Sequence, residues 1–393
     1  MIPDQENRMA PSTSTGITAS EAPKQTPSAG GRIGVGIVGA GVISNEYLKN
    51  LTAFPDLAVA FIADLDTARA AEQAEAWGVP DSGSYAELLA REDIEIVVNL
   101  TIPAVHVEVA LQAVRAGKHV WSEKPYALDR ESGHQLRQAA EQAGVRIAVA
   151  PDTFLGAGLQ TALRTVRSGA IGTPLTALTL FQVPGPESWH PSPEFLFARG
   201  AGPLFDIGPY YLTTLVQFFG PIRRVAATGS QARATRVIGS GPKAGTEFPV
   251  EVPTHVSALI EFESGASAQS VFSFDSQLPR AGFVEIAGSE GTAVLPDPNV
   301  FDGETTLHTG GAEPEVISPQ GSFHTRGTGV AELAQAIRAD RRERVPGDLA
   351  LHVLDAMVSI AEAVESGQFV EVASTVEVSE PLDIDWDPTR PTH

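Results

Sequence analysis

One short stretch near the start of the chain constrains the fold more than any other part of the sequence. Residues Ile33–Val38 form an apolar run interrupted only by glycines, and this pattern predicts a buried strand. Gly39 and Gly41 follow directly, and a helix is predicted to begin near Val42. A strand, a glycine-rich turn and a helix in this order are typical of a site that binds a dinucleotide.

The two glycines suit a dinucleotide for different physical reasons. Gly39 allows a tight turn, and Gly41 has no Cβ, so the backbone can approach a pyrophosphate closely. The N–H groups of Val42 and Ile43 at the helix N-terminus, together with the helix dipole, attract the same anion. Ser44 stands where the motif usually has a third Gly or Ala, but Ser still permits close packing of the helix on the strand. On the motif alone, an ordinary glycine-rich turn remains the alternative.

The alternation of strands and helices continues to residue 150 and predicts a doubly wound parallel sheet of the α/β class. Its ligand crevice is expected at the carboxyl ends of the strands. One run, at residues 94–100, is continuously apolar, as expected of a strand buried on both faces. We expect strands at 33–38, 58–63, 94–100, 118–121 and 146–150, a short strand near Val79, and helices from Val42 through Leu51 and at 67–77, 104–116 and 129–143.

Asp64 closes the second predicted strand. A carboxylate at this place can accept hydrogen bonds from both hydroxyls of the adenosine ribose, and it repels the 2′-phosphate of NADP. Asp64 therefore favours NAD over NADP as the cofactor. Two alternatives stay open. In the first, Arg69 in the next helix binds a 2′-phosphate, and in the second, Asp64 caps that helix and does not bind the cofactor.

After Pro151 the pattern changes to a run of strands with alternating polar and apolar residues. These strands are typical of an α+β domain with one large, mostly antiparallel open sheet, covered on one face by helices. We therefore divide the chain into a dinucleotide-binding domain at residues 31–150 and a second domain at residues 151–375. We expect strands at 175–183, 225–229, 255–262, 268–274, 283–287 and 292–295, and helices at 159–167, 204–219, 330–339 and 349–365.

Both ends of the chain differ in composition from the two domains. Residues 1–30 are rich in Ser, Thr, Pro, Ala and Gly and lack apolar periodicity, so we expect a disordered arm. Residues 376–393 carry several acidic side chains, and we expect a solvated acidic tail there.

Charge and composition exclude several classes of protein. The formal net charge of −21 argues against binding to nucleic acid or anionic lipid, because both require a basic surface. The absence of cysteine excludes disulfides, thiolate metal sites and cysteine nucleophiles, and no other metal-ligand spacing stands out. No apolar run reaches the roughly 18 residues of a membrane span, and the N-terminus lacks the apolar region of a signal peptide. We therefore expect a cytoplasmic protein without a metal.

Four separated motifs occur along the chain at residues 39–41, 101–106, 123–125 and 200–210. Together and in this order they resemble the motifs of the glucose–fructose oxidoreductase and inositol dehydrogenase family (Gfo/Idh/MocA), and the likeness spans residues 32–370. The resemblance implies a Rossmann domain followed by an α+β domain that binds substrate, and a nicotinamide cofactor. It also implies homodimers or homotetramers formed through the open face of the large sheet, and a reaction at one carbon of a sugar or cyclitol.

The resemblance identifies Lys124, Asp206 and Tyr210 as the catalytic residues. Lys124 would contact both the nicotinamide end of the cofactor and the reacting hydroxyl, where an ammonium stabilises the negative charge that develops on oxygen. Most family members place a proton-transferring His four residues after the Asp, but this chain has Tyr210 there, as glucose–fructose oxidoreductase and the dihydrodiol-dehydrogenase-like members do. A free phenol has a pKa near ~10, which must be lowered for proton transfer near neutral pH.

Other positions carried over from the family contact the cofactor. Glu123 is expected near the nicotinamide ribose, and Thr101 and His106 belong to the turn that faces the nicotinamide side of the site. With the glycine turn included, the expected cofactor-binding residues are Gly39, Gly41, Val42, Ile43, Asp64, Thr101, His106, Glu123 and Lys124.

Substrate contacts are expected from both domains. Asp152 occupies a family position that often holds Asn. Trp189 and His190 lie in a loop and suit a pyranose ring and its hydroxyls, although a packed surface loop is an equal alternative. His324 and Arg326, just before a predicted helix, are weaker candidates. The expected substrate-binding residues are Lys124, Asp152, Trp189, His190 and Tyr210.

These residues favour one function and leave two alternatives. The favoured function is an NAD-dependent oxidoreductase that transfers hydride to or from a secondary hydroxyl or carbonyl of a sugar, cyclitol or glycoside. The first alternative is a hydrolase that oxidises a sugar transiently to cleave a glycosidic bond, which would accumulate no NADH. The second is a non-catalytic NAD-binding regulator, against which the intact set of Lys124, Asp206 and Tyr210 argues.

Overall fold

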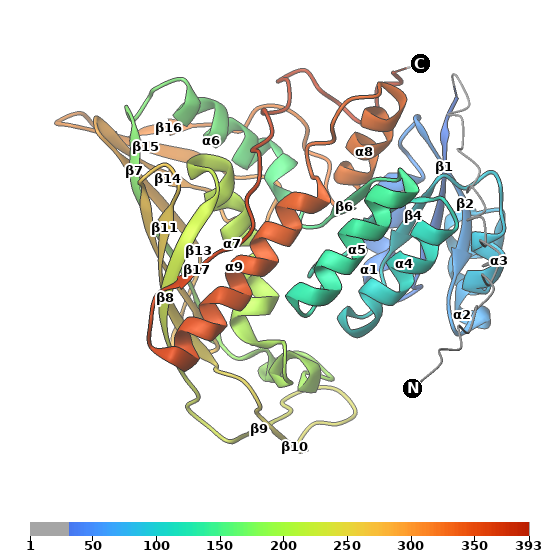
Figure 1. The fold of residues 1–393 in the computed structure, drawn as a ribbon, viewed down its shortest axis with the longest axis horizontal. Helices are drawn as coiled ribbons and strands as arrows, with labels where there is room; N and C mark the ends of the chain where they lie inside the picture. Colours follow the sequence, from blue (N-terminus) through green and yellow to red (C-terminus); the bar gives the residue numbers. More distant parts are fainter. Residues whose placement is uncertain (1–30, 393) are drawn as a thin grey trace, which may run out of the picture.

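The computed structural model describes residues 31–392, so the arm expected at residues 1–30 lies outside the described residues. The first domain is built on six parallel strands in the order β3-β2-β1-β4-β5-β6 (Figure 1). β1 and β4 are buried along their whole length, as continuous apolar runs should be in a parallel sheet. The strands are β1 (Ile33–Val38), β2 (Leu57–Ala63), β3 (Asp81–Gly83), β4 (Ile96–Asn99), β5 (His119–Ser122) and β6 (Ile147–Val149).

Helices connect these strands and confirm the doubly wound prediction. Asp66 caps α2 by accepting hydrogen bonds from the N–H groups of Ala68 and Arg69, and Asp129 caps α5 through the N–H of Ser132. The strand order reverses between β1 and β4, which is where such sheets open a crevice for a ligand. The helices are α1 (Val42–Leu51), α2 (Thr67–Trp77), α3 (Tyr85–Leu89), α4 (His106–Arg115) and α5 (Arg130–Ala143), with a short 3₁₀ turn, η1 (Pro103–Val105), before α4.

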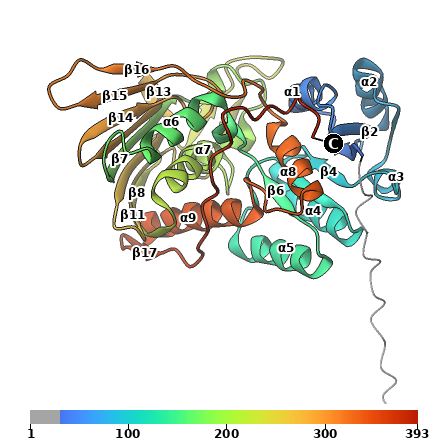
Figure 2. The ribbon, with the colours of Figure 1, turned by 90° about the horizontal axis from the view of Figure 1, so that it is seen from above.

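The second domain contains a nine-stranded sheet in the order β16-β15-β14-β13-β7-β12-β11-β8-β17. Helices α6 (Ala157–Arg167), α7 (Gly202–Phe219) and α9 (Gly347–Ser366) cover one face of this sheet, and the other face stays open (Figure 2). Neighbouring strands are antiparallel except β7 and β12, which run parallel, and this confirms the prediction of a mostly antiparallel sheet. The strands are β7 (Pro174–Pro184), β8 (Ile222–Ser230), β11 (His255–Phe262), β12 (Ser267–Ser273), β13 (Asp275–Gly288), β14 (Gly291–Leu295), β15 (Thr305–Thr309), β16 (Glu315–Ile317) and β17 (Val370–Glu371).

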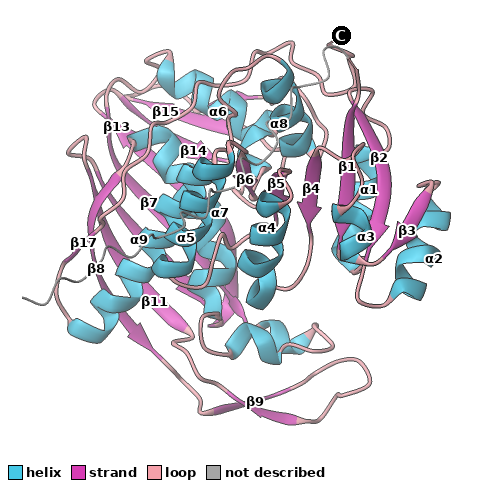
Figure 3. Ribbon diagram, turned by 45° about the vertical axis from the view of Figure 1, so that its right-hand side comes forward, coloured by secondary structure: helices cyan, strands magenta, loops and turns pink. Residues whose placement is uncertain are grey.

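A small two-stranded sheet of β9 (Thr235–Val237) and β10 (Glu247–Pro249) projects beyond one end of the large sheet (Figure 3). The buried side chain of Arg236 on β9 forms ion pairs with Glu187 and Asp275. These ion pairs join β9 to the loop after β7 and to β13, and that loop contains the short turns η3 (Pro186–Ser188) and η4 (Glu194–Phe197). A separate apolar core supports this region and consists of Leu196, Phe197, Ile238, Phe248, Val250 and Phe274.

The end of the chain returns to the first domain. α8 (Thr328–Arg338) packs beside α1, and α9 packs beside α5. Beyond α9, the Trp386 indole N–H donates to the side chain of Gln335, and the Thr392 N–H donates to Asp56 of the first domain. Val376 and Leu382 are buried, and Figure 2 shows the C-terminus beside the first domain. Residues 376–392 therefore lie along both domains, while the acidic side chains of Glu377 and Glu380 are exposed.

Two features are absent from residues 31–392. The helices in this part of the chain lack the length and apolar character needed to cross a membrane. The same residues contain no group of three His, Asp or Glu side chains placed to hold a metal ion.

Candidate active site

The turn between β1 and α1 has the form of a phosphate-binding cradle. Gly39 has a φ of 102°, and a Cβ there would lie 2.7 Å from the carbonyl oxygen of Leu100, so glycine is required. Gly41 precedes α1 without a side-chain cap, and a Cβ there would point into open space. Val42, the first helical residue, is 90 % exposed. The first N–H groups of α1 are therefore available to an anion, as a dinucleotide site requires.

Asp64 lies at the carboxyl end of β2, beside this turn. Its carboxylate accepts hydrogen bonds from the N–H of Ala40 at 2.7 Å, from the N–H of Asp66 at 2.9 Å and from the Arg69 guanidinium at 2.6 Å. Burial acts to raise the pKa of Asp64, but these hydrogen bonds outweigh burial and hold the pKa below its usual value. Asp64 is therefore an anion beside the glycine turn, and Arg69 binds one of its oxygens.

The turn after β4 is held by the buried side chains of Asn99 and His106. Asn99 accepts from the N–H and hydroxyl of Thr101 and donates to the carbonyl of His106. The two ring nitrogens of His106 lie 2.9 Å from the Thr101 carbonyl oxygen and 3.0 Å from the Pro125 carbonyl oxygen. Both oxygens are acceptors, so a ring nitrogen that carries a proton donates to the oxygen that it faces. The buried His106 thus links the turns after β4 and β5, and its ring does not face the open cleft.

Lys124 follows β5 and reaches across to α7 in the second domain. Its Nζ donates hydrogen bonds of 2.8 Å to both the carboxylate and the backbone carbonyl of Asp206. Burial alone would lower the pKa of Lys124, but the charge of Asp206 outweighs burial and raises the pKa. Lys124 is therefore a fixed cation at the boundary between the domains.

Tyr210 lies one turn after Asp206 on α7, so their side chains share a helix face. The Lys124 Nζ lies 5.4 Å from the centre of the Tyr210 ring. The Tyr210 hydroxyl accepts a hydrogen bond of 3.3 Å from Nη2 of Arg326, which precedes α8. The structure thus brings Lys124, Asp206 and Tyr210 together and adds Arg326. Sequence reasoning ranked Arg326 low because 116 residues separate it from Tyr210 and no spacing links the two.

Glu123 is held inside the site by aromatic side chains. Its Oε1 accepts a hydrogen bond of 2.8 Å from the Tyr47 hydroxyl, whose oxygen accepts one of 3.1 Å from the indole N–H of Trp121. Burial, with the nearby charge of Glu123, raises the pKa of Tyr47, so its phenol keeps its proton. Sequence reasoning missed Tyr47, and the one available signal was its place on the first helix after the glycine turn.

Asp152 follows β6 and is fully buried, outside the lining of the cleft. Its Oδ2 accepts hydrogen bonds from the N–H groups of Gly327 at 3.1 Å and Gly329 at 3.0 Å. Burial raises the pKa of Asp152 to about 6, even though the charge of Arg326 acts to lower it. Asp152 therefore fixes the turn that carries Arg326, and its position offers no direct path to a substrate.

A cleft of about 410 Å³ opens beside Lys124 and Asp206. Its walls come from the turns after β4 and β5 and from the segment between η4 and α7, and they consist mainly of carbon. The other lining residues are Ile102, Pro103, Ala104, Pro125, Leu128, Phe195, Leu196, Ala198, Arg199, Gly200, Ala201 and Phe205.

The loop after β7 reaches this cleft through Phe195. The ring of His190 lies edge-on to Trp189 and to Phe195, with ring centres 5.5 Å apart in each pair. Trp189 is 66 % exposed. Phe195 lines the cleft, so the expected substrate contacts Trp189 and His190 form a layer behind its wall.

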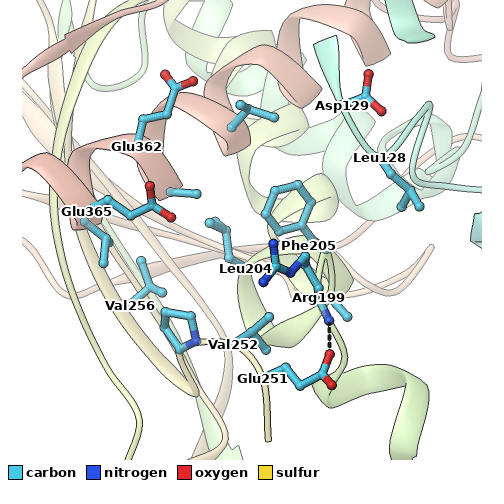
Figure 4. Close-up of a pocket in the computed structure, with 16 residues that line it drawn as sticks. Leu128, Asp129, Arg199, Leu204, Phe205, Glu251, Val252, Val256, Glu362 and Glu365 are labelled. Carbon is cyan, nitrogen blue, oxygen red and sulfur yellow. Dashed lines mark hydrogen bonds between the residues drawn. The ribbon is translucent and has the colours of Figure 1, made fainter. Parts of the chain in front are cut away.

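A second cavity of about 440 Å³ shares Leu128, Arg199 and Phe205 with the cleft as a common wall (Figure 4). Its floor is apolar, and carboxylates stand around its rim. Glu251 accepts a hydrogen bond of 3.2 Å from the N–H of Arg199, and Glu362 on α9 pairs with a neighbouring arginine. The space beside Lys124 is therefore bordered by a second apolar pocket.

Two family models match the chain. Residues 33–150 match the GFO/IDH/MocA model described as an oxidoreductase family with an NAD-binding Rossmann fold. Residues 159–294 match the GFO/IDH/MocA C-terminal domain. The two matches correspond to the parallel sheet and to most of the large mixed sheet.

Similar proteins include reductases and dehydrogenases. The chain is 26 % identical over 344 residues to 1,5-anhydro-D-fructose reductase of Ensifer adhaerens, covering 86 % of this chain and 98 % of that protein. It is 31 % identical over 159 residues to inositol 2-dehydrogenase 3 of Saccharopolyspora erythraea, covering 40 % of this chain and 47 % of that protein. Levoglucosan dehydrogenase in complex with NADH and L-sorbose shares the fold, with a TM-score of 0.77 at 21 % identity over 88 % of this chain and 100 % of that chain.

Proposed function

The chain belongs to the Gfo/Idh/MocA family of oxidoreductases, and we propose that it transfers hydride between NAD and a secondary hydroxyl or carbonyl group of a sugar, a cyclitol or a glycoside. The observation that carries this proposal is the contact between Lys124 of the first domain and Asp206 of the second. Lys124 and Asp206 both line the cleft, and the Tyr210 ring lies 5.4 Å from the Lys124 Nζ, one helical turn after Asp206. The glycine turn that receives the cofactor lies in the same domain as Lys124.

Each polar residue has a separate part in the proposed reaction. NAD, when bound, accepts the hydride, and the glycine turn, Asp64 and Glu123 would hold it. In the oxidative direction Tyr210 takes the proton of the substrate hydroxyl. Lys124 stabilises the negative charge that develops on the same oxygen, and Asp206 orients the ammonium of Lys124.

Names of the relatives and the walls of the cleft support the substrate class. The relatives include 1,5-anhydro-D-fructose reductase and inositol 2-dehydrogenase 3, which are named for a sugar derivative and a cyclitol. Burying many hydroxyls against carbon walls leaves hydrogen bonds unmade and is unfavourable. In a glycoside a bond to a second group replaces the anomeric hydroxyl of the sugar. A glycoside therefore suits this cleft better than a free sugar.

We also propose that the protein forms homodimers or homotetramers through the open face of the nine-stranded sheet. Leu178 and Leu180 of β7 lie on this face, and Val271 of β12 stands opposite Leu180. The alternate residues Ala177 and Thr179 are buried on the other face, under the helices. A row of apolar side chains on an uncovered face is a surface that a second copy of the chain can bury.

Lys124→Met tests the proposed chemistry, because it keeps the length of the side chain and removes its charge. We expect turnover to fall on the order of 10²-fold or more, as when one preorganised charge at a developing oxyanion is lost. NAD binding should survive in part, since the glycine turn is unchanged. The assay follows NADH fluorescence with a panel of sugars, inositols and glycosides.

Lys49→Met is the matched control, because Lys49 lies exposed near the end of α1. Its turnover should equal that of the wild type. Near-normal turnover of Lys124→Met would remove Lys124 from the reaction. Cleavage of glycosides without accumulation of NADH would instead favour the hydrolase.

A further inference from the structure

Arg326 joins the expected catalytic group through the hydroxyl of Tyr210. Its Nη2 donates to that oxygen at 3.3 Å, and its Nη1 lies 3.9 Å from the carboxylate of Glu123. Nη1 is buried and has no hydrogen-bond partner among residues 31–392. A guanidinium with a spare donor in this position can stabilise negative charge on the Tyr210 oxygen.

The turn that carries Arg326 is fixed from two sides. The side-chain amide of Asn50 on α1 donates to the carbonyl oxygen of Arg326 at 2.8 Å. Asp152 accepts from the N–H groups of Gly327 and Gly329 on the other side. A Cβ at Gly329 would lie 2.1 Å from the indole ring beneath it, so the turn also requires glycine. Arg326 is therefore held by backbone that the first domain restrains.

Charged groups surround Tyr210, but they are not equivalent. Lys124 gives both of its Nζ hydrogen bonds to Asp206, and that carboxylate offsets its charge. Arg326 contacts the Tyr210 oxygen directly. The titratable groups in this surrounding are Lys124 after β5, Asp206 on α7, Arg326 before α8, Glu123 after β5, Asp152 after β6 and Tyr47 on α1.

We propose that Arg326 is a positioning residue whose hydrogen bond orients the Tyr210 oxygen and stabilises negative charge on it when Tyr210 takes the proton of the substrate. This inference rests on the proposed function, since it assigns a role within the same site. In oxidation the O–H bond of the substrate breaks, an O–H bond to Tyr210 forms, and hydride leaves the same carbon for NAD. A charge-assisted hydrogen bond from Arg326 is stronger to the phenolate than to the phenol, so it favours the form that accepts a proton.

A titration of tyrosine absorbance tests this role without any substrate. The chain has five tyrosines, and burial raises the pKa of Tyr47, Tyr85, Tyr126 and Tyr211. We therefore expect the phenolate signal that appears at the lowest pH to come from Tyr210. Its absence in Tyr210→Phe would verify that assignment.

Arg326→Gln should move the midpoint of this signal upward by about one pH unit or more, the usual effect of removing an adjacent opposite charge. Arg326→Lys keeps the charge but loses the guanidinium fork, so it should move the midpoint upward by a smaller amount. Circular dichroism verifies that each variant is folded. If Arg326→Gln does not fold, the Lys variant still decides the matter.

Arg338→Gln is the matched control, because Arg338 lies at the other end of α8 and pairs with Glu95. Its midpoint should equal that of the wild type. Where a substrate gives turnover, the acidic limb of the pH profile of kcat/KM should move upward in Arg326→Gln and stay in place in Arg338→Gln.

The two proposals fail in different ways. A folded Arg326→Gln or Arg326→Lys protein with the wild-type midpoint would overturn the role of Arg326, whatever the substrate panel shows. A panel that yields no NADH would count against the proposed function and would leave the absorbance titration to decide the role of Arg326.

Discussion

At the scale of single residues, we expect Asp64 to influence whether the protein uses NAD or NADP. Two of its hydrogen bonds come from backbone N–H groups and fix the carboxylate, whereas the third comes from Arg69. The side chain of Arg69 is 52 % exposed, so it is the partner that can move. If Arg69 turns outward, Asp64 is free for ribose hydroxyls, and the same guanidinium becomes available to a 2′-phosphate. The preference for NAD that we propose therefore depends on both residues.

Asp64→Ala should narrow the preference for NAD over NADP by about tenfold or more, because it removes charge-assisted hydrogen bonds to the ribose and the repulsion of a 2′-phosphate. Arg69→Ala should act in the opposite direction and weaken the use of NADP. The ratio of kcat/KM for the two cofactors measures both effects. An unchanged ratio in Asp64→Ala would exclude Asp64 as the selecting residue.

That Lys124, Asp206 and Tyr210 lie close together was predictable from the family resemblance, which implied all three. Lys124 follows a strand, and Asp206 and Tyr210 are one helical turn apart. The contact of Tyr210 with Arg326 was not predictable from the sequence. It depends on how α8 docks on the first domain, which Asn50 and Asp152 determine from distant parts of the chain.

At the scale of elements, a buried histidine connects α9 to the large sheet. Nε2 of His352 accepts a hydrogen bond of 2.9 Å from the N–H of Ile222 at the start of β8, and Nδ1 lies 3.0 Å from the hydroxyl of Ser374. Burial lowers the pKa of His352 to about 4, and burial has the same effect on His119 of β5. Both side chains are therefore neutral in the folded protein at neutral pH.

These histidines should make stability depend on pH below neutrality. An unfolded chain binds their protons near pH ~6.5. The folded chain resists protonation until about pH 4. The stabilisation is therefore fully present above ~6.5 and lost as the pH falls toward 4, at up to about 1.4 kcal/mol per pH unit for each histidine.

His352→Gln should lower the slope of the free energy of unfolding against pH by about 1 kcal/mol per pH unit between pH 5 and 6. The remaining slope in this range belongs in part to His119. Urea unfolding at several pH values measures the slopes, with the exposed His308→Gln as control. An unaltered slope in His352→Gln would mean that His352 is protonated in the folded state.

Most long elements were predictable, although β13 begins eight residues before its predicted start, and very short elements were not predictable. α2 has the predicted bounds, and β11 has the bounds that its alternating pattern predicted. β9 and β10 have three residues each, which is too short for a period to be visible. The parallel pairing of β7 with β12 was also hidden, because strand direction depends on the path between strands.

At the scale of the whole molecule, the open sheet face is the surface on which assembly should depend. Leu180→Asp with Val271→Asp places two charges opposite each other on adjacent strands of this face. We expect the double variant to remain folded and to dissociate into monomers, because a charge inside an apolar interface is strongly unfavourable. Light scattering after size-exclusion chromatography measures the mass. Val237→Asp on the exposed β9 is the control and should leave the mass unchanged.

The central place of β7 in the nine-stranded sheet also determines when that sheet can form. β7 is the first of its strands to be synthesised, yet its two neighbours are β12 and β13. Thr179 and Ser270, which bond across β7 and β12, are 91 residues apart in the chain. Closing so long a loop costs entropy before any pairing compensates for it, which makes folding slow. β11 with β12, and β13 with β14, can pair as hairpins, but these parts become one sheet only when β7 pairs with both β12 and β13.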